Sequence, residues 1–568
     1  MTEQMKIVIV GGVAAGPKAA ARARRLNPRA AITILEKGNY ISYSACGLPF
    51  LISGEVPDVK NLLASPVGVM RNADYFRLVK DINVLTGKEV LAIDRPAKAV
   101  KVRDVATSKE ETYPYDKLVL ATGALPVRLK VPGIDAQNVF VIRQPEHGLA
   151  VMAALEKEKP SHAALIGAGA ISLEVAEAFV KWGVKVTVVE AMDSIFPGLL
   201  DPEMGAILAR HVESKGVEVR TGEMATGFGT DENGRLNRVF TSKGEFPAEL
   251  AVIAIGVRPN VTLARDAGLD IGETGAIKVD QELRTSDPDI YAGGDCIEAF
   301  HRLLKRPVVV SSGQQANIQG RVIGTNLAGG HMVYRGMVGT GVAKVFDYTA
   351  GATGLTEAAA RQAGFEVETV LVPDLDHAYY IHDAFFVALK MVADKATGRI
   401  LGVQAVGPGD GAKRLDTAAA GISLGATVDD FTQLNTGYSP PHSLAIDVLI
   451  SAAQVMQNKL TGVASCLSPL EVQKMTDQGE DFTLLDVRTP PEYQRVRVKN
   501  PKVSAIPLGQ LRDKAQDLSK DKLYIPFCQQ SLRGYEASKI LQGMGFKKVK
   551  FMEGGILHWP FELEQGEQ

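Results

Sequence analysis

Residues 5–16 read MKIVIVGGVAAG, an apolar run that passes directly into closely spaced glycines. An apolar strand, a glycine turn and a helix-forming stretch, here residues 18–26, are typical of the first unit of a dinucleotide-binding domain. A second apolar strand over residues 31–35 ends in Glu36, about twenty residues beyond the glycines as such domains require. This spacing predicts a pyrophosphate at the helix N-terminus and a ribose bound by Glu36.

The same pattern recurs in residues 163–190. An apolar strand runs into Gly167-Ala168-Gly169, a helix follows to about Trp182, and a strand over residues 184–189 ends in Glu190. A single glycine fingerprint is weak evidence, but here both glycine runs follow a strand, open a helix and precede an acid. The sequence therefore predicts two nucleotide sites.

Further apolar strands ending in small-residue turns occur at residues 115–123, 252–259 and 290–296. The simplest organisation is a first nucleotide domain that is interrupted by a second and then resumed. We predict an α/β fold with two Rossmann-like domains, an α+β domain of the interface type and a final α/β unit. The expected boundaries are 1–145 and 271–333 for the first domain, 146–270 for the second, 334–462 for the interface domain and 463–568 for the last unit.

Composition limits the class of protein. Hydrophobic residues make up 46% of the 568 residues and charged residues 23%, which is usual for a soluble protein with several cores. A formal net charge of −2 argues against nucleic acid or an anionic membrane as the main partner. Four cysteines are too few for a disulfide scaffold, and the sequence has neither a membrane-spanning run nor metal-ligand spacing. We therefore expect a soluble, cytoplasmic protein whose thiol chemistry is catalytic.

Acidic residues help to assign the two nucleotides. Asp295 follows a glycine turn far downstream, which suits a polyol chain such as the ribityl group of FAD. The interrupted domain is therefore expected to bind FAD and the inserted domain a nicotinamide cofactor. Glu190 is followed by Ala191-Met192-Asp193 without a nearby arginine, so a 2′-phosphate would meet repulsion. NADH is expected rather than NADPH.

Cys46 is the candidate redox residue. Positions 47–51 read GLPFL, so it has no local cysteine partner, and a lone thiol beside a flavin cannot store electrons as a neighbouring disulfide. It must cycle through a sulfenic acid, a persulfide or a mixed disulfide with a small thiol. A helix starting near Gly47, the flavin ring and tyrosine hydroxyls are expected to lower its pKa. Cys296 is interpreted as a buried small residue, and Cys466 as an incidental thiol without basic neighbours.

Residues 1–462 resemble the pyridine nucleotide-disulfide oxidoreductase superfamily, most closely its single-cysteine coenzyme A disulfide reductases and persulfide reductases. The motifs are GGVAAG (11–16), SxxxCGLP (42–49), GAGAISLE (167–174), YAGGDC (291–296) and YSPP (438–441). The resemblance implies a homodimer in which Tyr380 and Tyr438 of one subunit serve the Cys46 of the other. The alternative for either tyrosine is an ordinary core or interface residue.

The resemblance also implies ligand contacts, residue by residue. The implied FAD-binding residues are Gly11, Gly12, Ala15, Gly16, Glu36, Lys37, Thr122, Gly123, Arg143, Gly294, Asp295 and Ala316. The implied NAD-binding residues are Gly167, Gly169, Ile171, Glu190 and Gly256. The implied coenzyme A-binding residues are Lys18, Arg22, Arg25, Ser42, Lys80 and Asn317. Positions 18, 22 and 25 share one helix face, which suits bound phosphates or, alternatively, a solvated basic surface.

A second thiol, Cys528, follows the apolar strand 523–527 and precedes a helix that begins at Leu532. Backbone N–H groups curling around this sulfur would form an anion-binding nest, to which Arg533 adds positive charge. Such a loop stabilises a thiolate and a persulfide. Residues 465–565 resemble a single rhodanese domain, also through LDVR (485–488) and GGIxxW (554–559). The alternative is an inactive rhodanese-like interaction module.

These observations favour an NADH-dependent persulfide, polysulfide or coenzyme A disulfide reductase. Electrons would pass from NADH through FAD to Cys46, while Cys528 carries sulfane sulfur and sulfide is released. One alternative is an NADH oxidase or peroxidase in which Cys46 forms a sulfenic acid. Others are a sulfurtransferase with a regulatory flavin domain and a sulfur-sensing interaction protein. The sequence does not specify the physiological sulfur donor.

Overall fold

The computed structural model describes residues 4–566. The chain divides into two compact units, and each contains residues from separate parts of the sequence. Residues 4–189 and 223–337 form the first unit, and residues 190–222 and 338–566 form the second. Across the described residues, no helix combines the length and apolar character needed to cross a membrane.

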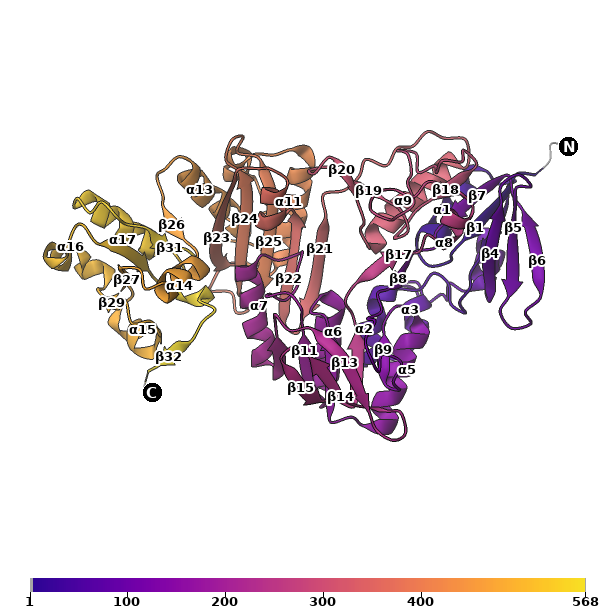
Figure 1. Ribbon diagram of the computed structural model, residues 1–568. Coiled ribbons are helices and arrows are strands. Elements are labelled where there is room, and N and C mark those ends of the chain that lie inside the picture. Colours follow the sequence, from indigo (N-terminus) through magenta and orange to yellow (C-terminus); the bar gives the residue numbers. More distant parts are fainter. Residues whose placement is uncertain (1–3, 567–568) are drawn as a thin grey trace. The chain divides into compact units, whose positions relative to one another are not determined.

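The first unit contains a parallel sheet around β1 (Lys6–Val10). β1 lies between β2 (Ala31–Leu35) and β7 (Lys117–Leu120), and β3 (Asn83–Leu85) and β18 (Ile290–Ala292) form the edges (Figure 1). β18 returns to this sheet after the second nucleotide domain in the chain. The prediction of one nucleotide domain interrupted by another is therefore confirmed.

Beside this sheet, α1 (Ala15–Leu26) packs closely against α9 (Gly313–Asn326). A Cβ atom at Gly324 would lie 2.4 Å from the backbone oxygen of Ala19. Only glycine permits this approach of the two backbones. The packing fixes α9 against the helix that opens at the first glycine turn.

The second sheet of this unit contains β11 (Lys185–Val189), β10 (His162–Ile166), β16 (Leu250–Ile253) and β9 (Val139–Val141), paired in parallel. Its β10 strand leads into α6 (Ala170–Lys181). Every residue of β10 and β16 is buried, as expected for a sheet covered on both faces. This is the predicted second Rossmann-like domain.

Two three-stranded antiparallel sheets were not predicted. Their strands carry polar residues or glycines between buried positions, so they lack the continuous apolar runs that identified the other strands. The first sheet contains β4 (Lys88–Asp94), β5 (Ala99–Asp104) and β6 (Glu110–Pro114), and the second β13 (Ala225–Thr230), β14 (Leu236–Thr241) and β15 (Gly244–Pro247).

The second unit is built on a five-stranded antiparallel sheet (Figure 1). Helix α11 (Gly411–Leu424) packs on β22 and β25, and α13 (Val448–Leu460) packs on β23 and β24. In order, the strands are β21 (Thr340–Val345), β22 (Tyr348–Gly354), β25 (Ile400–Gly407), β24 (Phe386–Asp394) and β23 (Val367–Leu375). This is the predicted α+β domain.

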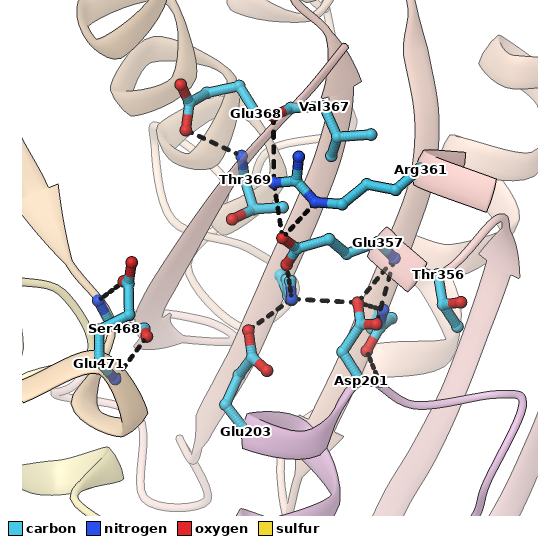
Figure 2. A network of polar contacts seen from close by, with 12 residues as sticks. Asp201, Glu203, Thr356, Glu357, Arg361, Val367, Glu368, Thr369, Ser468 and Glu471 are labelled. Atoms are coloured by element: carbon cyan, nitrogen blue, oxygen red, sulfur yellow. Dashed lines mark hydrogen bonds and ion pairs between the residues drawn. The ribbon is translucent and has the colours of Figure 1, made fainter. Parts of the chain in front are cut away.

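A buried ion cluster joins this sheet to α7 (Pro202–Ser214). The Nζ atom of Lys390, on β24, lies 3.0 Å from Oδ2 of Asp201 and 2.9 Å from Oε2 of Glu357, and it also pairs with Glu203. Figure 2 shows these three carboxylates converging. Burial lowers the pKa of Lys390, but the carboxylates outweigh it and raise the pKa above its usual value. The lysine therefore stays charged and holds α7 on the sheet.

The C-terminal part of the second unit is a small α/β domain. Its central strand β27 (Phe482–Asp486) pairs in parallel with β29 (Val503–Ala505) and β30 (Leu523–Phe527). The predicted strand 523–527 and the predicted helix from Leu532 are observed, the latter as α17 (Leu532–Gly543). The same domain contains β26 (Cys466–Leu467), α14 (Pro469–Asp477) and β31 (Phe551–Met552).

Candidate active site

The first glycine turn leaves no room for side chains. Gly11 has φ +108°, and a Cβ atom there would lie 2.1 Å from the backbone oxygen of Ala121. A Cβ atom at Gly16 would lie 2.0 Å from the backbone oxygen of Gly11. The backbone N–H of Gly12 donates to Oε2 of Glu36 at 2.7 Å, which fixes the carboxylate beside the turn.

Helix α1 opens at this turn without a side-chain cap or an acid in its first turn, within the described chain. Its N-terminal N–H groups and the helix dipole therefore suit a pyrophosphate. Together with the fixed carboxylate of Glu36, which suits a ribose hydroxyl, these residues fit the adenosine diphosphate end of FAD.

The second glycine turn has the same construction. Gly167 has φ +96°, and a Cβ atom there would lie 2.7 Å from the backbone oxygen of Ala254. Helix α6 begins after Gly169, and among the described residues neither a side-chain cap nor a first-turn acid occupies its N-terminus. The N–H of Met192 donates to Oε1 of Glu190 at 2.9 Å, which orients that carboxylate. The turn and the N-terminus of α6 fit the pyrophosphate of a dinucleotide, and the Glu190 carboxylate by itself suits a ribose with free hydroxyls.

Four of the implied FAD-binding residues lie together in the first unit. Nη2 of Arg143 pairs with Oδ2 of Asp295 at 2.9 Å, and the same nitrogen lies 3.3 Å from the Cβ position of Gly123. Gly294 has φ +86° and donates its N–H to Oε1 of Gln319, on α9, at 2.7 Å. The Gly-Asp turn is therefore held from α9 and from Arg143.

Cys46 lies in a short 3-10 helix, Ala45–Gly47, which passes into α2 (Leu48–Ile52). The segment is anchored to the first glycine turn because the N–H of Ser42 donates to the backbone oxygen of Gly12 at 2.7 Å. The thiol itself is exposed. It is therefore available to an external sulfur compound.

The protein surroundings do not lower the pKa of Cys46. Desolvation by neighbouring atoms and the negative charge of Glu174 raise it, whereas Arg143 lowers it and Asp295 raises it. A backbone hydrogen bond at Cys46 also lowers the pKa, but burial and the carboxylates outweigh it. The expected contributions of the helix start, the flavin ring and the tyrosines remain predictions.

The other cysteine of the first unit, Cys296, is fully buried. Its Sγ atom contacts the backbone oxygens of Gly293 at 3.4 Å and Leu120 at 3.6 Å. Burial raises the pKa of its thiol. Its interpretation as a buried small residue is confirmed.

Cys466 corrects the expectation of a thiol without basic neighbours. Its Sγ atom lies 3.2 Å from Oε2 of Glu553 and interacts with Lys459, which also pairs with Glu368 at 3.0 Å. Lys459 lies on α13, and its contact with Cys466 was not evident from the sequence. Burial and Glu553 raise the pKa of Cys466 well above its usual value, which keeps the thiol protonated.

The implied coenzyme A residues occupy three helices of the first unit and the segment before Cys46. Lys18 and Arg22 are partly buried along the face of α1 that meets α9, and Nε of Arg22 donates to Oγ1 of Thr325 at 3.0 Å. Arg25 is exposed on the same helix. The Asn317 side chain donates to the backbone oxygen of Gly313 at 2.8 Å. Phosphate binding by these residues remains a prediction.

Lys80 stands apart from these contacts. It is the last residue of α4 (Ala73–Lys80), and its Nζ atom lies 5.6 Å from the centroid of the Tyr75 ring.

Tyr380 and Tyr438 lie in the second unit, on two loops that meet. The N–H of Ala378 donates to the backbone oxygen of Pro440 at 3.1 Å, which joins the two loops. In the single chain, Tyr380 is 63% exposed and Tyr438 is 55% exposed. Neither tyrosine is therefore an ordinary core residue.

The Cys528 loop is held by the Gly-Gly segment that follows β31. The N–H of Ile556 donates to the backbone oxygen of Cys528 at 2.9 Å, and the N–H of Gly554 donates to Oγ of Ser531 at 2.9 Å. A Cβ atom at Gly555 would lie 2.2 Å from the backbone oxygen of Gln530. Cys528 is 2% exposed at the base of this loop. The loop conformation is therefore fixed by its own domain.

Arg533 does not act as an isolated charge at this loop. Its guanidinium donates to both carboxylate oxygens of Glu492, at 2.7 and 2.8 Å. Hydrogen bonds from Arg533 lower the pKa of Glu492 to about 2. Glu492 and the nearby Cys528 sulfur raise the pKa of Arg533. The pair thus orients the guanidinium toward the sulfur while neutralising part of its charge.

Sequence reasoning missed two charged residues at these sites. Glu174, on α6, lies within the 167–174 motif, and no sequence signal links it to Cys46, because its effect comes from the proximity of separate segments. Glu492 carried a usable signal, because Thr489-x-x-Glu492 has the spacing of a capping box, and the N–H of Thr489 donates to Oε2 of Glu492 at 3.0 Å.

Two nucleotide turns, followed in the chain by an antiparallel domain and a thiol loop, define a two-nucleotide reductase joined to a sulfurtransferase-type domain. Residues 5–320 match the family described as pyridine nucleotide-disulphide oxidoreductase, and the chain belongs to that family. Residues 341–449 match its dimerisation domain, and residues 468–560 match the rhodanese-like domain.

Relatives cover most or all of the chain. It is 35% identical over 459 residues to the NAD(P)H coenzyme A polysulfide/persulfide reductase of Pyrococcus horikoshii, covering 80% of this chain and 100% of that protein. The structure of a NAD-dependent persulfide reductase from A. fulgidus is 40% identical, with a TM-score of 0.93 and coverage of 98% and 100%. The reduced Bacillus anthracis CoADR-RHD structure is 33% identical, with a TM-score of 0.90 and coverage of 98% of each chain.

Proposed function

We propose that this protein is an NADH-dependent reductase of persulfides, polysulfides or coenzyme A disulfide. The observation that carries the proposal is the accessibility of the thiols: Cys46 is exposed and the other three cysteines are buried. A lone exposed thiol between the two nucleotide turns of one unit suits chemistry with an external sulfur compound rather than with a second cysteine of the chain. The names of the relatives described above agree with this reaction class.

The reaction balances with a low-molecular-weight persulfide, RSSH. The Cys46 thiolate attacks the sulfur attached to R, which forms a Cys46–S–S–R disulfide and releases hydrosulfide. When bound, FAD supplies two-electron transfer from NADH to sulfur. Reduction of the mixed disulfide returns the Cys46 thiolate and releases RS⁻. The sum is RSSH + NADH + H⁺ → RSH + H₂S + NAD⁺.

Residues of the chain stabilise the anions of this cycle. Arg143 lowers the pKa of Cys46 and opposes the effect of Glu174. We propose that Tyr380 and Tyr438 of the partner subunit in a homodimer donate hydrogen bonds to the sulfur anions. Lys18, Arg22, Arg25, Ser42, Lys80 and Asn317 are proposed to bind coenzyme A, the small thiol of the reaction.

Cys528 is proposed to carry sulfane sulfur. Its loop opens α17, whose first turn carries no acid within the described residues, and Arg533 is aimed at the sulfur by Glu492. Attack of Cys528 on a sulfane donor would leave a persulfide that these donors stabilise. That sulfur can then pass to the small thiol that is released when the mixed disulfide at Cys46 is reduced.

The test is sulfide release from a persulfide and NADH under anaerobic conditions. The wild type should release one sulfide for each NADH oxidised. Cys46→Ser should abolish the reaction, whereas the matched variant Cys528→Ser should affect only substrates that need sulfur transfer. Unchanged turnover by Cys46→Ser would falsify the proposal.

The same assays separate the alternatives. Rapid oxygen-dependent oxidation of NADH without any thiol would favour an NADH oxidase. Cyanide-dependent thiocyanate formation that requires Cys528, with negligible NADH-linked activity, would favour a sulfurtransferase. Partner binding without turnover in either assay would favour an interaction protein.

A further inference from the structure

The rings of Tyr380 and Tyr438, on two loops of the second unit, are only partly covered, and Tyr380 meets the neighbouring Tyr379 ring edge-on with 5.4 Å between centroids. Residues 376–385 connect β23 to β24, and residues 433–447 lead into α13. Tyr380 and Tyr438 are more than half exposed in the single chain. Because exposed side chains take their position mainly from their backbone, the anchor of these loops determines where the hydroxyl groups lie.

That anchor is Arg414, on α11, whose side chain is 1% exposed. Its Nη2 atom donates to the backbone oxygen of Asp376 at 2.6 Å, at the start of the first loop. The same nitrogen pairs with Oδ2 of Asp447 at 2.6 Å, at the end of the second loop. A third bond runs from Nη1 to the backbone oxygen of Asp410 at 2.8 Å. One buried guanidinium therefore contacts both loops.

Asp447 extends the anchor into the Tyr438 loop. It caps α13 by accepting from the N–H of Leu449 at 3.0 Å, and it accepts from Oγ of Ser443 at 2.8 Å. Burial raises the pKa of Asp447, but Arg414 and these donors outweigh that effect and lower it. The carboxylate is thus ionised and holds residue 443, close in sequence to the tyrosine.

Asp376 extends the anchor into the Tyr380 loop. Its Oδ1 atom accepts from the N–H of Phe385 at 3.0 Å and closes the loop across its base. Its Oδ2 atom accepts from the N–H of Asp410 at 3.0 Å. Together with the hydrogen bond between Ala378 and Pro440, these contacts connect the two loops to each other and to Arg414.

We propose that Arg414 is a positioning residue for the chemistry at Cys46, acting by fixing Tyr380 and Tyr438 relative to each other. The inference rests on the proposed role of the two tyrosines. It extends that role to a residue that contacts neither ring. Lysine at position 414 would keep the charge but lose the planar fork in which Nη2 reaches Asp376 and Asp447 while Nη1 holds the backbone oxygen of Asp410.

The decisive experiment compares Arg414→Lys, the double variant Tyr380→Phe/Tyr438→Phe, and the triple variant. The readouts are persulfide turnover, the rate of flavin reduction by NADH, and the pH at which thiolate-to-flavin charge-transfer absorption appears. Arg414→Lys should lower turnover about 10-fold and move the absorption to higher pH, with flavin reduction unchanged. The triple variant should match the double variant, because a residue that acts through the tyrosines adds nothing once they are removed.

A matched control is Arg488→Lys, which alters another buried arginine–aspartate pair, with Nη2 of Arg488 2.6 Å from Oδ2 of Asp486. It should leave the pH of the absorption unchanged. If Arg414→Lys does not fold, Ser443→Ala removes one bond of the same anchor and should show the same shift at smaller size.

Three results would overturn the inference. The first is a turnover in the triple variant that falls by the product of the Arg414→Lys loss and the double-variant loss. The second is a loss of flavin reduction in Arg414→Lys that equals its loss of turnover. The third is the same shift of the charge-transfer absorption in the Arg488→Lys control. If the tyrosine double variant is fully active, the proposed tyrosine role fails first. If only the double variant is impaired, the positioning role alone fails.

Discussion

The two thiols of this chain occupy opposite kinds of environment. Cys46 is exposed on a one-turn helix, and its protein surroundings raise its pKa. Cys528 is buried at the base of a loop that backbone hydrogen bonds and Arg533 hold in place. In the proposed mechanism, the first site therefore depends on groups outside its own segment, namely a cofactor and a second subunit. The second site is complete within one small domain.

The largest expected effect separates the two sites completely. Cys528→Ser should reduce transfer of sulfur from thiosulfate to cyanide by about 1000-fold, because the nucleophile is lost. Reduction of a small persulfide by NADH should remain within about 2-fold of wild type. Parallel loss of both activities would show that the thiols work as one site.

A smaller effect should distinguish the charges around Cys46. Arg143 lowers the pKa of Cys46 and Glu174 raises it. Arg143→Met should therefore move the acidic limb of the turnover–pH profile to higher pH, and Glu174→Gln should move it to lower pH. We expect changes of about 3- to 10-fold at a pH on that limb. Flavin content serves as the control, and shifts in the same direction would contradict the prediction.

The Arg533–Glu492 pair should leave a signature in stability. The pKa of Glu492 is lowered to about 2 in the folded chain, so the pair stabilises the fold above the ordinary glutamate pKa and loses this effect as pH falls toward 2. Glu492→Gln should flatten that part of the stability–pH curve. The measurement is urea unfolding followed by Trp559 fluorescence in a Trp182→Phe background. An unchanged slope would mean that the pair contributes nothing to stability.

The smallest effect is expected at Ser531. Ser531→Ala removes the hydrogen bond from Gly554, worth about 1 kcal/mol. Sulfur transfer by Cys528 should fall about 3-fold, because the other bonds still hold the loop. The reaction at Cys46 should not change. A loss as large as that of Cys528→Ser would show that this hydroxyl has a direct chemical role.

The parts of the fold that were predictable depend on local rules. Glycine turns with no room for a Cβ atom, such as the one at Gly11, mark their own position in the sequence. Buried parallel strands such as β10 appear as continuous apolar runs. Strands such as β6, with alternating exposed positions and a polar sequence, do not appear in this way and were missed.

The parts of the site that were not predictable depend on contacts between separate secondary-structure elements. Glu174 affects Cys46, and Lys459 contacts Cys466, only because the fold brings separate elements together. Neither neighbour has a fixed spacing from its cysteine. The charge on Arg533 was expected, but its pairing with Glu492 becomes visible only when α17 meets the residue that caps α15 (Pro490–Arg495).

The ion cluster around Lys390 restricts how this protein can be recombined with its relatives. Asp201 and Glu203 lie within the predicted NAD-binding segment, whereas Lys390 and Glu357 lie in the dimerisation domain. A chimera that exchanges only residues 146–270 for a segment without these acids would leave a buried ammonium short of two carboxylates, at a cost of about 3–5 kcal/mol. Engineering a new nicotinamide preference by module exchange therefore requires an incoming segment that keeps acids at positions 201 and 203.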